Sequence, residues 1–172
     1  MKVFRFLSLT LFAVSFSLNL VAQHSNKKSI SHASHNHEFD PHKYHIGIGL
    51  GGAHIFSENV QAPAFHLHFL RQLGHQNQWG LGIGYEAIAD EHWHNGLNLL
   101  LNYRPLRFLS LLAGPGLVIG KHDGKTEVLP AFHTEAVFEF NAGGLHIGPM
   151  IGYGLDKEDS HITVGVHVGF GF

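Results

Sequence analysis

The sequence contains no cysteine among its 172 residues, and charged residues make up only 14% of it. Without cysteine there is no disulfide framework, no thiolate metal ligand, no cysteine nucleophile and no attachment point for a lipoprotein anchor. This composition fits a chain that enters an oxidising compartment without using disulfides. The formal net charge is −2 and no basic patch is present, so nucleic acid is not an expected partner.

Long apolar runs are lacking beyond the N-terminal segment. The most apolar later stretch is cut in two by residues 104–107, Arg-Pro-Leu-Arg, so membrane-spanning helices are not expected. Residues 1–22 are expected to be a secretory signal peptide, with Lys2 and Arg5 before an apolar core and the small Ala22 at the cleavage point. An uncleaved membrane anchor is the alternative, and the short apolar core disfavours it.

The chain is rich in histidine, with 17 imidazoles against 11 lysines and arginines. Residues 23–43 have almost no aliphatic side chains and are expected to form a disordered periplasmic tail. Imidazole suits zinc, copper and nickel, so a flexible histidine-rich tail predicts capture of a divalent transition metal. The alternative is a solvated linker. The histidines proposed as ligands here are His32, His35, His37 and His42, with His45 just beyond the tail.

From Tyr44 onward, large apolar residues alternate with small or polar ones, which is the period of a β-strand with two unlike faces. Eight such runs are separated by turn signals. They cover residues 44–56, 64–73, 79–89, 93–104, 108–121, 128–140, 145–155 and 161–172. Gly51-Gly52 shifts the phase of the alternation, which predicts a β-bulge in the first run. Each run is long enough to cross a bilayer as a tilted strand.

The two faces of these runs predict which side meets lipid. One face carries leucine, isoleucine, valine and phenylalanine with almost no charge, and the other carries glycine, histidine, glutamate and asparagine. A soluble barrel would need its polar face outside, whereas a membrane barrel places its apolar face outside. Residues 44–172 are therefore expected to form an eight-stranded antiparallel up-and-down transmembrane β-barrel of the all-β class.

The links support this topology. Residues 104–107 and 141–144 are expected to be tight turns, the link 74–78 is longer, and the links at the opposite end carry most of the acids. With the N-terminal tail in the periplasm, the first, third, fifth and seventh links would lie outside the cell. Aromatic residues near predicted strand ends indicate interfacial girdles. These are Tyr44, Trp79, Trp93, Tyr103, Phe108 and Tyr153.

The last run, residues 161–172, alternates without interruption and finishes with Phe170 and Phe172. This pattern resembles the C-terminal signature of bacterial outer-membrane barrels, a strand that their assembly machinery reads. The region 44–172 resembles the small eight-stranded barrels of outer-membrane proteins A, X and W. The resemblance implies the outer membrane of a Gram-negative bacterium, with its lipid and the barrel-assembly machinery as partners, and it implies little about function.

The polar face should line a narrow lumen. Its expected members are His66, His68, Glu86, His94, Asn98, Asn102, His133, Glu135, Glu139, His146, His161 and His167. Hairpin geometry predicts that His66 lies opposite Glu86 and that Glu139 lies opposite His146. His66 and His68, two residues apart on one face, could act as joint metal ligands.

These residues suggest a non-enzymatic barrel that binds or handles a divalent transition metal, with Zn²⁺ as the expected ion. The proposed lumen ligands are His45, His66, His68, Glu86, His133, Glu135, Glu139 and His146. The alternative is a structural or adhesive barrel whose histidines and glutamates only satisfy one another. A lipid hydrolase is disfavoured because Ser110, the only serine well inside a strand, has no same-facing histidine neighbour. Eight strands leave too little space for a wide pore.

Overall fold

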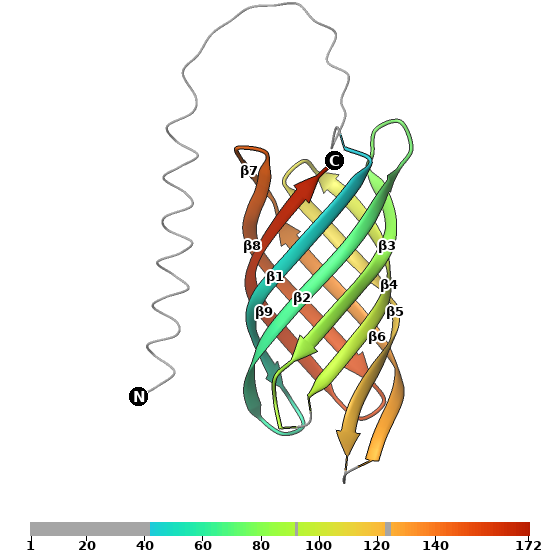
Figure 1. The fold of residues 1–172 in the computed structure, drawn as a ribbon, viewed down its shortest axis with the longest axis vertical. Coiled ribbons are helices and arrows are strands. Elements are labelled where there is room, and N and C mark those ends of the chain that lie inside the picture. Colours follow the sequence, from blue (N-terminus) through green and yellow to red (C-terminus); the bar gives the residue numbers. More distant parts are fainter. Residues whose placement is uncertain (1–41, 92, 123–124) are drawn as a thin grey trace, which may run out of the picture. The chain divides into compact units, whose positions relative to one another are not determined.

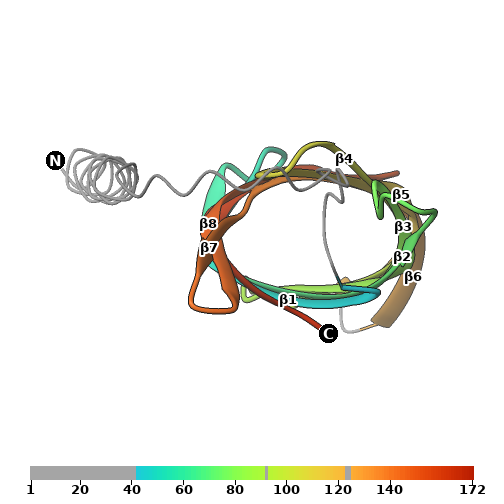
Figure 2. The same ribbon diagram turned by 90° about the horizontal axis from the view of Figure 1, so that it is seen from above.

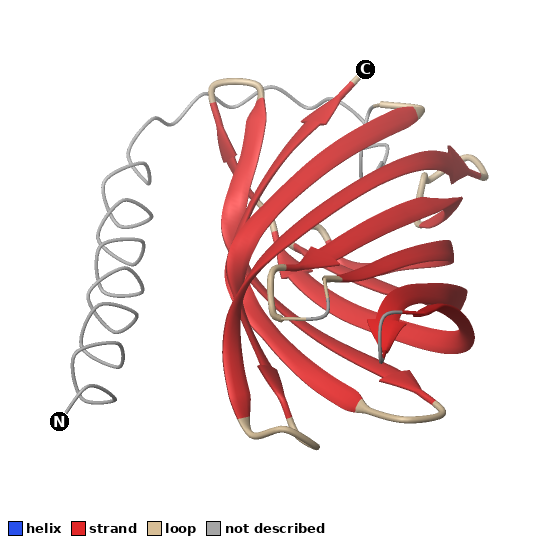
Figure 3. Ribbon diagram, turned by 60° about the horizontal axis from the view of Figure 1, so that its bottom comes forward, coloured by secondary structure: helices blue, strands red, loops and turns tan. Residues whose placement is uncertain are grey.

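The computed structural model describes residues 42–91, 93–122 and 125–172. All regular structure in these ranges is β-strand (Figure 3). No helix in them is long and apolar enough to cross a membrane. The predicted signal peptide and all of the predicted tail except His42 and Lys43 lie outside the described residues.

The strands form one antiparallel sheet that closes on itself as a barrel (Figures 1 and 2). They are β1 (Tyr44–Ile55), β2 (Val60–Leu73), β3 (Trp79–Ile88), β4 (His94–Leu106), β5 (Leu109–His122), β6 (Lys125–Phe138), β7 (Phe140–Ala142), β8 (Leu145–Asp156) and β9 (Ser160–Gly171). Each strand pairs with the next one along the chain, except that β6 and β7 both pair with β8 and not with each other, and β1 also pairs with β9. Two backbone hydrogen bonds of 3.0 Å between Tyr44 and Phe172 join the start of β1 to the C-terminal residue.

β6 and β7 are two parts of one strand, so the closed barrel has eight strands. Val137 in β6 pairs with Met150 and Phe140 in β7 pairs with Ile147, which is a single uninterrupted register against β8. Between these pairs, Phe138 and Glu139 face Pro149 and Gly148, and Pro149 has no backbone N–H to donate to a ladder. The predicted all-β, eight-stranded up-and-down architecture is confirmed.

The predicted faces of the sheet are confirmed as well. Large apolar side chains stand exposed on the outside of every strand longer than three residues, and Leu50, Leu97 and Leu99 are each more than half exposed. Histidine, glutamate and asparagine are buried on the inward face. Because burying apolar surface is favourable and this surface has no protein cover, hydrocarbon is the environment that suits it.

Two local predictions are wrong. Strand β1 pairs without a register shift on both of its sides, so there is no bulge at Gly51-Gly52. The irregularity lies instead in β4, where the register against β5 shifts between Tyr103 and Leu106. Arg104 and Pro105 therefore belong to a bulged strand end, and the turn is confined to Arg107 and Phe108.

The barrel has two unlike ends. The terminal end carries Tyr44 and Phe172, the five-residue link 74–78 and a two-residue turn at Gly143 and Gly144, whose φ angles are 66° and 94°. Positive φ at both positions is the geometry of the hairpin turns that glycine favours. The distal end carries the links after β1, β3 and β8.

Aromatic side chains gather on the outside near both ends of the barrel, as predicted. At the terminal end Trp79 packs on Tyr103 with ring centroids 4.4 Å apart, and Tyr44 stacks on Phe69 and Phe172. Trp93 is 61% exposed at the distal end. Such belts suit the two interfaces of a bilayer.

The alternation alone predicts a polar interior, but the interior of the barrel is only partly polar. Two groups of apolar side chains are buried inside the barrel. One group is Ala53, Ile55, Ala62, Ala64 and Ile88, and the other is Leu70, Leu100, Leu112, Val137 and Met150. They fill space beside the polar residues and fix the rotamers available to them.

Candidate metal centre

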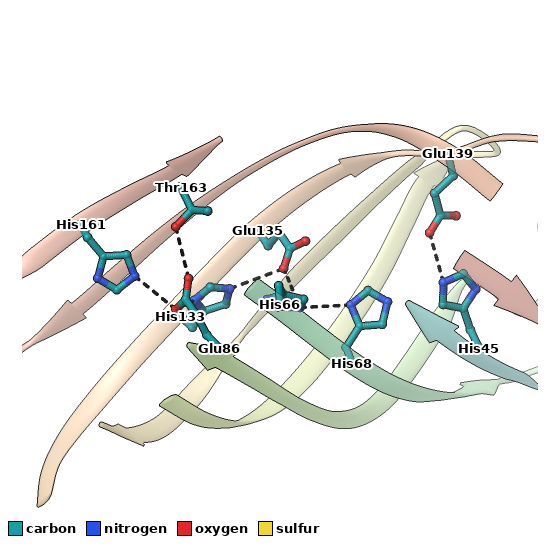
Figure 4. Close-up of polar contacts among 9 residues, drawn as sticks. All are labelled: His45, His66, His68, Glu86, His133, Glu135, Glu139, His161 and Thr163. Atoms are coloured by element: carbon teal, nitrogen blue, oxygen red, sulfur yellow. Dashed lines mark hydrogen bonds and ion pairs between the residues drawn. The ribbon is translucent and has the colours of Figure 1, made fainter. Parts of the chain in front are cut away.

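The polar side chains of the lumen form a row that runs from the distal end to the terminal end (Figure 4). Strands β1, β2, β3, β6, β8 and β9 contribute its members, because each places alternate side chains inward. We divide the row into a distal group and an imidazole group. The distal group is His66, Glu86, His133, Glu135, His161 and Thr163, and the imidazole group is His45, His68, His146 and His167.

Carboxylates organise the distal group. Glu86 Oε2 lies 3.2 Å from His161 Nε2 and 3.4 Å from His133 Nδ1, and Glu86 Oε1 accepts a hydrogen bond of 3.2 Å from Thr163 Oγ1. Glu135 Oε2 lies 3.1 Å from His66 Nε2 and 3.5 Å from His133 Nε2. Every imidazole of this group therefore lies within 3.5 Å of a carboxylate oxygen. The contacts of His133 and Glu135 have ion-pair distances, but neither side chain has a hydrogen-bond partner among the described residues.

In the imidazole group, contacts between rings predominate, although His45 Nε2 also lies 3.6 Å from Glu139 Oε1 (Figure 4). His45 stacks at centroid distances of 5.4 Å on His68, 5.5 Å on His146 and 5.8 Å on His167. His68 and His167 stack on each other at 5.0 Å. His66 joins the two groups, because its Nε2 lies 3.2 Å from His68 Nδ1.

Within the residues that the structure describes, His167 and His68 have buried ring nitrogens without a hydrogen-bond partner, as do several other side chains of the lumen. His167 is fully buried, and neither of its ring nitrogens has a hydrogen-bond partner among the described residues. His68 Nε2 also has no partner within this part of the chain. A buried polar atom without a hydrogen-bond partner lowers the stability of the fold by about 1–3 kcal/mol. A ligand bound to these nitrogens would remove that cost.

Glycine makes room for these rings. A Cβ atom at Gly47 would collide with the rings of His68 and His167, and a Cβ at Gly169 would lie 2.6 Å from the ring of His45. The inward faces of β1 and β9 are therefore bare backbone where the imidazoles lie, which lets three rings from three strands approach one another.

The lumen contains three groups of side chains whose ligand atoms lie within 4.8 Å of one another. They are His45, His68 and His167; His45, Glu139 and His146; and His66, His68 and Glu135. In a tetrahedral zinc site with Zn–N bonds of 2.0–2.1 Å, ligand nitrogens are about 3.3 Å apart. The limit of 4.8 Å in these sets is wider than that spacing, so a bound ion would draw the ligand atoms closer together.

The first set fits a transition metal best. His45, His68 and His167 are all buried imidazoles, whereas Glu139 in the second set is ion-paired with the buried guanidinium of Arg104. A metal cation on Glu139 would have to compete with that guanidinium. In the third set, Glu135 is already shared between His66 and His133.

A hollow opens at the distal end above the distal group. A cavity of about 180 Å³ is lined by Ser57, Glu58, His94, Val118, Gly120, Glu127, Leu129, Asp156, Glu158 and Asp159. A smaller cavity shares His94, Asp156 and Asp159 with it and reaches Glu86 and His161. The mouth of the lumen is thus lined by carboxylates and leads directly to the start of the row.

The structure brings many of the predicted residues together. The predicted lumen residues lie on the inward face, and the pairing of His66 with Glu86 is confirmed. The pairing of Glu139 with His146 is wrong by two residues, because His146 pairs with Asn141. The two side chains still approach each other, through their shared neighbour His45.

Of the histidines that the sequence groups with the tail, only His42 and His45 are among the described residues. His32, His35 and His37 lie outside the described residues. His42 lies against Gly171 of β9 and belongs to none of the three ligand sets. His45, grouped with the tail in the sequence, is an inward residue of β1 and lies at the centre of the imidazole group.

Sequence reasoning missed Arg104, which is buried and paired with Glu139. In the sequence it stands at the junction of the predicted run 93–104 and the predicted turn 104–107, and no role in the lumen is predicted for it. A usable signal was present, since Asn98, Asn102 and Arg104 continue one two-residue period along β4. His167 was predicted to face the lumen but was not named as a ligand.

Comparisons with solved structures agree with the barrel fold. No family model matches the sequence, and no curated protein matches it. A structure described as de novo design of transmembrane β-barrels is 12% identical, with a TM-score of 0.52 over 76% of this chain and 98% of that chain. Ail, the attachment invasion locus protein of Yersinia pestis, solved with the heparin analogue sucrose octasulfate, is 16% identical, with a TM-score of 0.51 over 75% of this chain and 97% of that chain.

The fold is a small transmembrane β-barrel. At these identities the likeness concerns fold alone, and function has to be argued from the lumen and the mouth. The transmembrane β-barrel accounts for the exposed apolar belt and the aromatic ends. It does not account for a row of imidazoles inside.

Proposed function

We propose that this chain is a non-enzymatic outer-membrane barrel that binds a divalent transition metal, Zn²⁺ in the first instance, at His45, His68 and His167. The observation that carries the proposal is the convergence of three buried imidazoles, of which His167 has no hydrogen-bond partner in the described part of the chain. Neutral imidazole is a ligand for zinc, copper and nickel, and a bound ion would satisfy the nitrogens that protein atoms leave over.

The proposal extends to the setting of the barrel. The apolar belt faces outer-membrane lipid, the barrel-assembly machinery inserts the chain, and the histidine-rich residues 23–43 lie in the periplasm. The tail would then raise the local concentration of metal beside the terminal end, where His45 and His146 lie.

Calorimetric titration of zinc into the purified barrel in detergent tests the proposal. Four proteins are compared: the full chain, a chain without residues 24–43, His167→Gln, and the control His75→Gln, in which the same change is made in an exposed link. We expect the lumen site to survive removal of the tail and His75→Gln, and to weaken at least 10-fold in His167→Gln. Absence of binding tighter than about 100 μM in both the full and the tail-less chain overturns it.

The competing function is a structural or adhesive barrel without a ligand, which the histidine–glutamate contacts of the distal group favour. A silent titration, with a surface or stability phenotype on deletion, would support it. Recognition of a sulfated ligand, as in the Yersinia pestis complex, would require positive charge at the mouth. The described mouth carries the opposite charge, from Glu58, Glu127, Asp156, Glu158 and Asp159.

A further inference from the structure

The row of ligands reaches both ends of the barrel, which is more than a single storage site requires. His161 and Glu86 line the distal cavity, and His146 at the terminal end is half-buried and stacks on His45. We propose that the lumen passes a dehydrated transition-metal ion between the distal mouth and the terminal end by exchanging it between neighbouring ligand sets. This inference rests on the proposed metal binding.

Overlap between the sets is the first argument. The set of His45, His68 and His167 shares His68 with the set of His66, His68 and Glu135, and shares His45 with the set of His45, Glu139 and His146. An ion moving from one set to the next keeps one ligand throughout the move. It therefore avoids the large cost of a bare charge in a low-dielectric interior.

The distal group continues the path to the mouth. Beyond His66 the row runs through Glu135, His133 and Glu86 to His161, and each step between ligand atoms measures between 3.1 and 3.5 Å. Carboxylates around the distal cavity would concentrate cations at its entrance. Carboxylate and imidazole ligands thus succeed one another from solvent to the buried imidazoles.

The filled lumen explains why such a path would select its ion. Leu70, Leu100, Leu112, Val137 and Met150 occupy the interior beside the row, and an eight-stranded barrel is only wide enough for its own side chains. A fully hydrated cation has no room. Mg²⁺ gives up its water reluctantly and prefers oxygen, so imidazole sets favour zinc, copper or nickel over it.

Arg104 suits release at the terminal end. Its guanidinium is paired with Glu139, the only carboxylate of the terminal ligand set. The positive charge disfavours a resident metal ion there, so an ion that reaches His146 is passed on to solvent instead of being held.

Metal flux into vesicles tests the path. The full barrel is reconstituted into phospholipid vesicles that contain a zinc-sensitive dye, and zinc or magnesium is added outside. We expect zinc to enter at least 10-fold faster than into protein-free vesicles and magnesium to enter at the protein-free rate. His161→Gln and His133→Gln, which interrupt the distal group, should each reduce zinc entry at least 5-fold while calorimetric binding at the His45, His68 and His167 set is retained.

The two proposals fail in different ways. Zinc binding with entry at the protein-free rate overturns the path and leaves the binding site standing. Entry that is equal for zinc and magnesium, or unchanged in both variants, indicates a non-selective leak and also overturns the path. Absence of calorimetric zinc binding by the unsubstituted chain overturns the proposed function itself. Folding of each variant is checked by its heat-dependent mobility on gels, and His161→Gln, whose side chain is partly exposed, remains informative if His133→Gln does not fold.

Discussion

The distal group and the imidazole group lie in one lumen and both contain buried histidines, yet these histidines have different neighbours. In the distal group each imidazole meets Glu86 or Glu135 at 3.1–3.5 Å. In the imidazole group the rings stack on one another, and His167 has no hydrogen-bond partner among the described residues. Carboxylates lie beside the distal imidazoles, whereas His167 lies against other imidazole rings, and the proposed metal ion would bind at this second arrangement.

The largest expected effect is on the distal group. Glu86→Gln removes the anionic acceptor shared by His133, His161 and Thr163, so we expect the free energy of unfolding to fall by about 3 kcal/mol. Urea unfolding from lipid micelles measures it. Glu91→Gln, made in an exposed link, is the matched control and should change stability by less than about 0.5 kcal/mol.

Zinc affinity at the imidazole group should be unchanged in Glu86→Gln, because no ligand of that set is touched. A stable Glu86→Gln protein would mean that the carboxylate is a replaceable part of the distal group. The contrast between the two groups would then lose its basis.

The next effect concerns the ion. If the imidazole group is completed by metal, zinc at 100 times its Kd should raise the free energy of unfolding by about 2.7 kcal/mol. The rise should vanish with a chelator and be absent in His167→Gln. An equal rise in His167→Gln would place the stabilising ion elsewhere in the chain.

A smaller effect tests the space between the rings. Gly47→Ala puts a methyl group against His68 and His167, so we expect a loss of about 2 kcal/mol in stability and at least 10-fold in zinc affinity. Gly52→Ala in the same strand is the control, since the nearest atom to its Cβ would be the Ala62 oxygen at 3.9 Å. Similar results for both variants would show that the gap at Gly47 does not position the two imidazoles.

The sequence predicts the barrel well because one rule, period-two alternation, decides strand direction, face and lipid exposure together. It predicts local exceptions poorly. Arg104-Pro105 has the composition of a turn but forms a bulged strand end, and this hid a buried cation. The hairpin of β7 and β8 was centred too early, because its turn is Gly143-Gly144, and this displaced the partner of Glu139.

The imidazole group could not be read from the sequence for a different reason. His45, His68 and His167 come from β1, β2 and β9, and β1 meets β9 only when the barrel closes. Their relative height depends on the register of that closure, where Gly47 pairs with both His68 and Gly169. Alternation fixes the face of each histidine but not its height in the lumen.

The smallest expected change separates the two groups most sharply. His167→Met replaces a buried imidazole that has no hydrogen-bond partner among the described residues with a flexible apolar side chain of similar size. Without metal, we expect the free energy of unfolding to stay the same or to rise by about 1 kcal/mol, because a buried polar group is removed and its ring nitrogens have no hydrogen-bond partner to lose among the described residues. The same change at His133, which lies between Glu86 and Glu135, should destabilise the barrel. If His167→Met proved as costly as His133→Met in metal-free urea unfolding, the imidazole at 167 would be a structural part of the fold, and the case for a ligand at that position would fail.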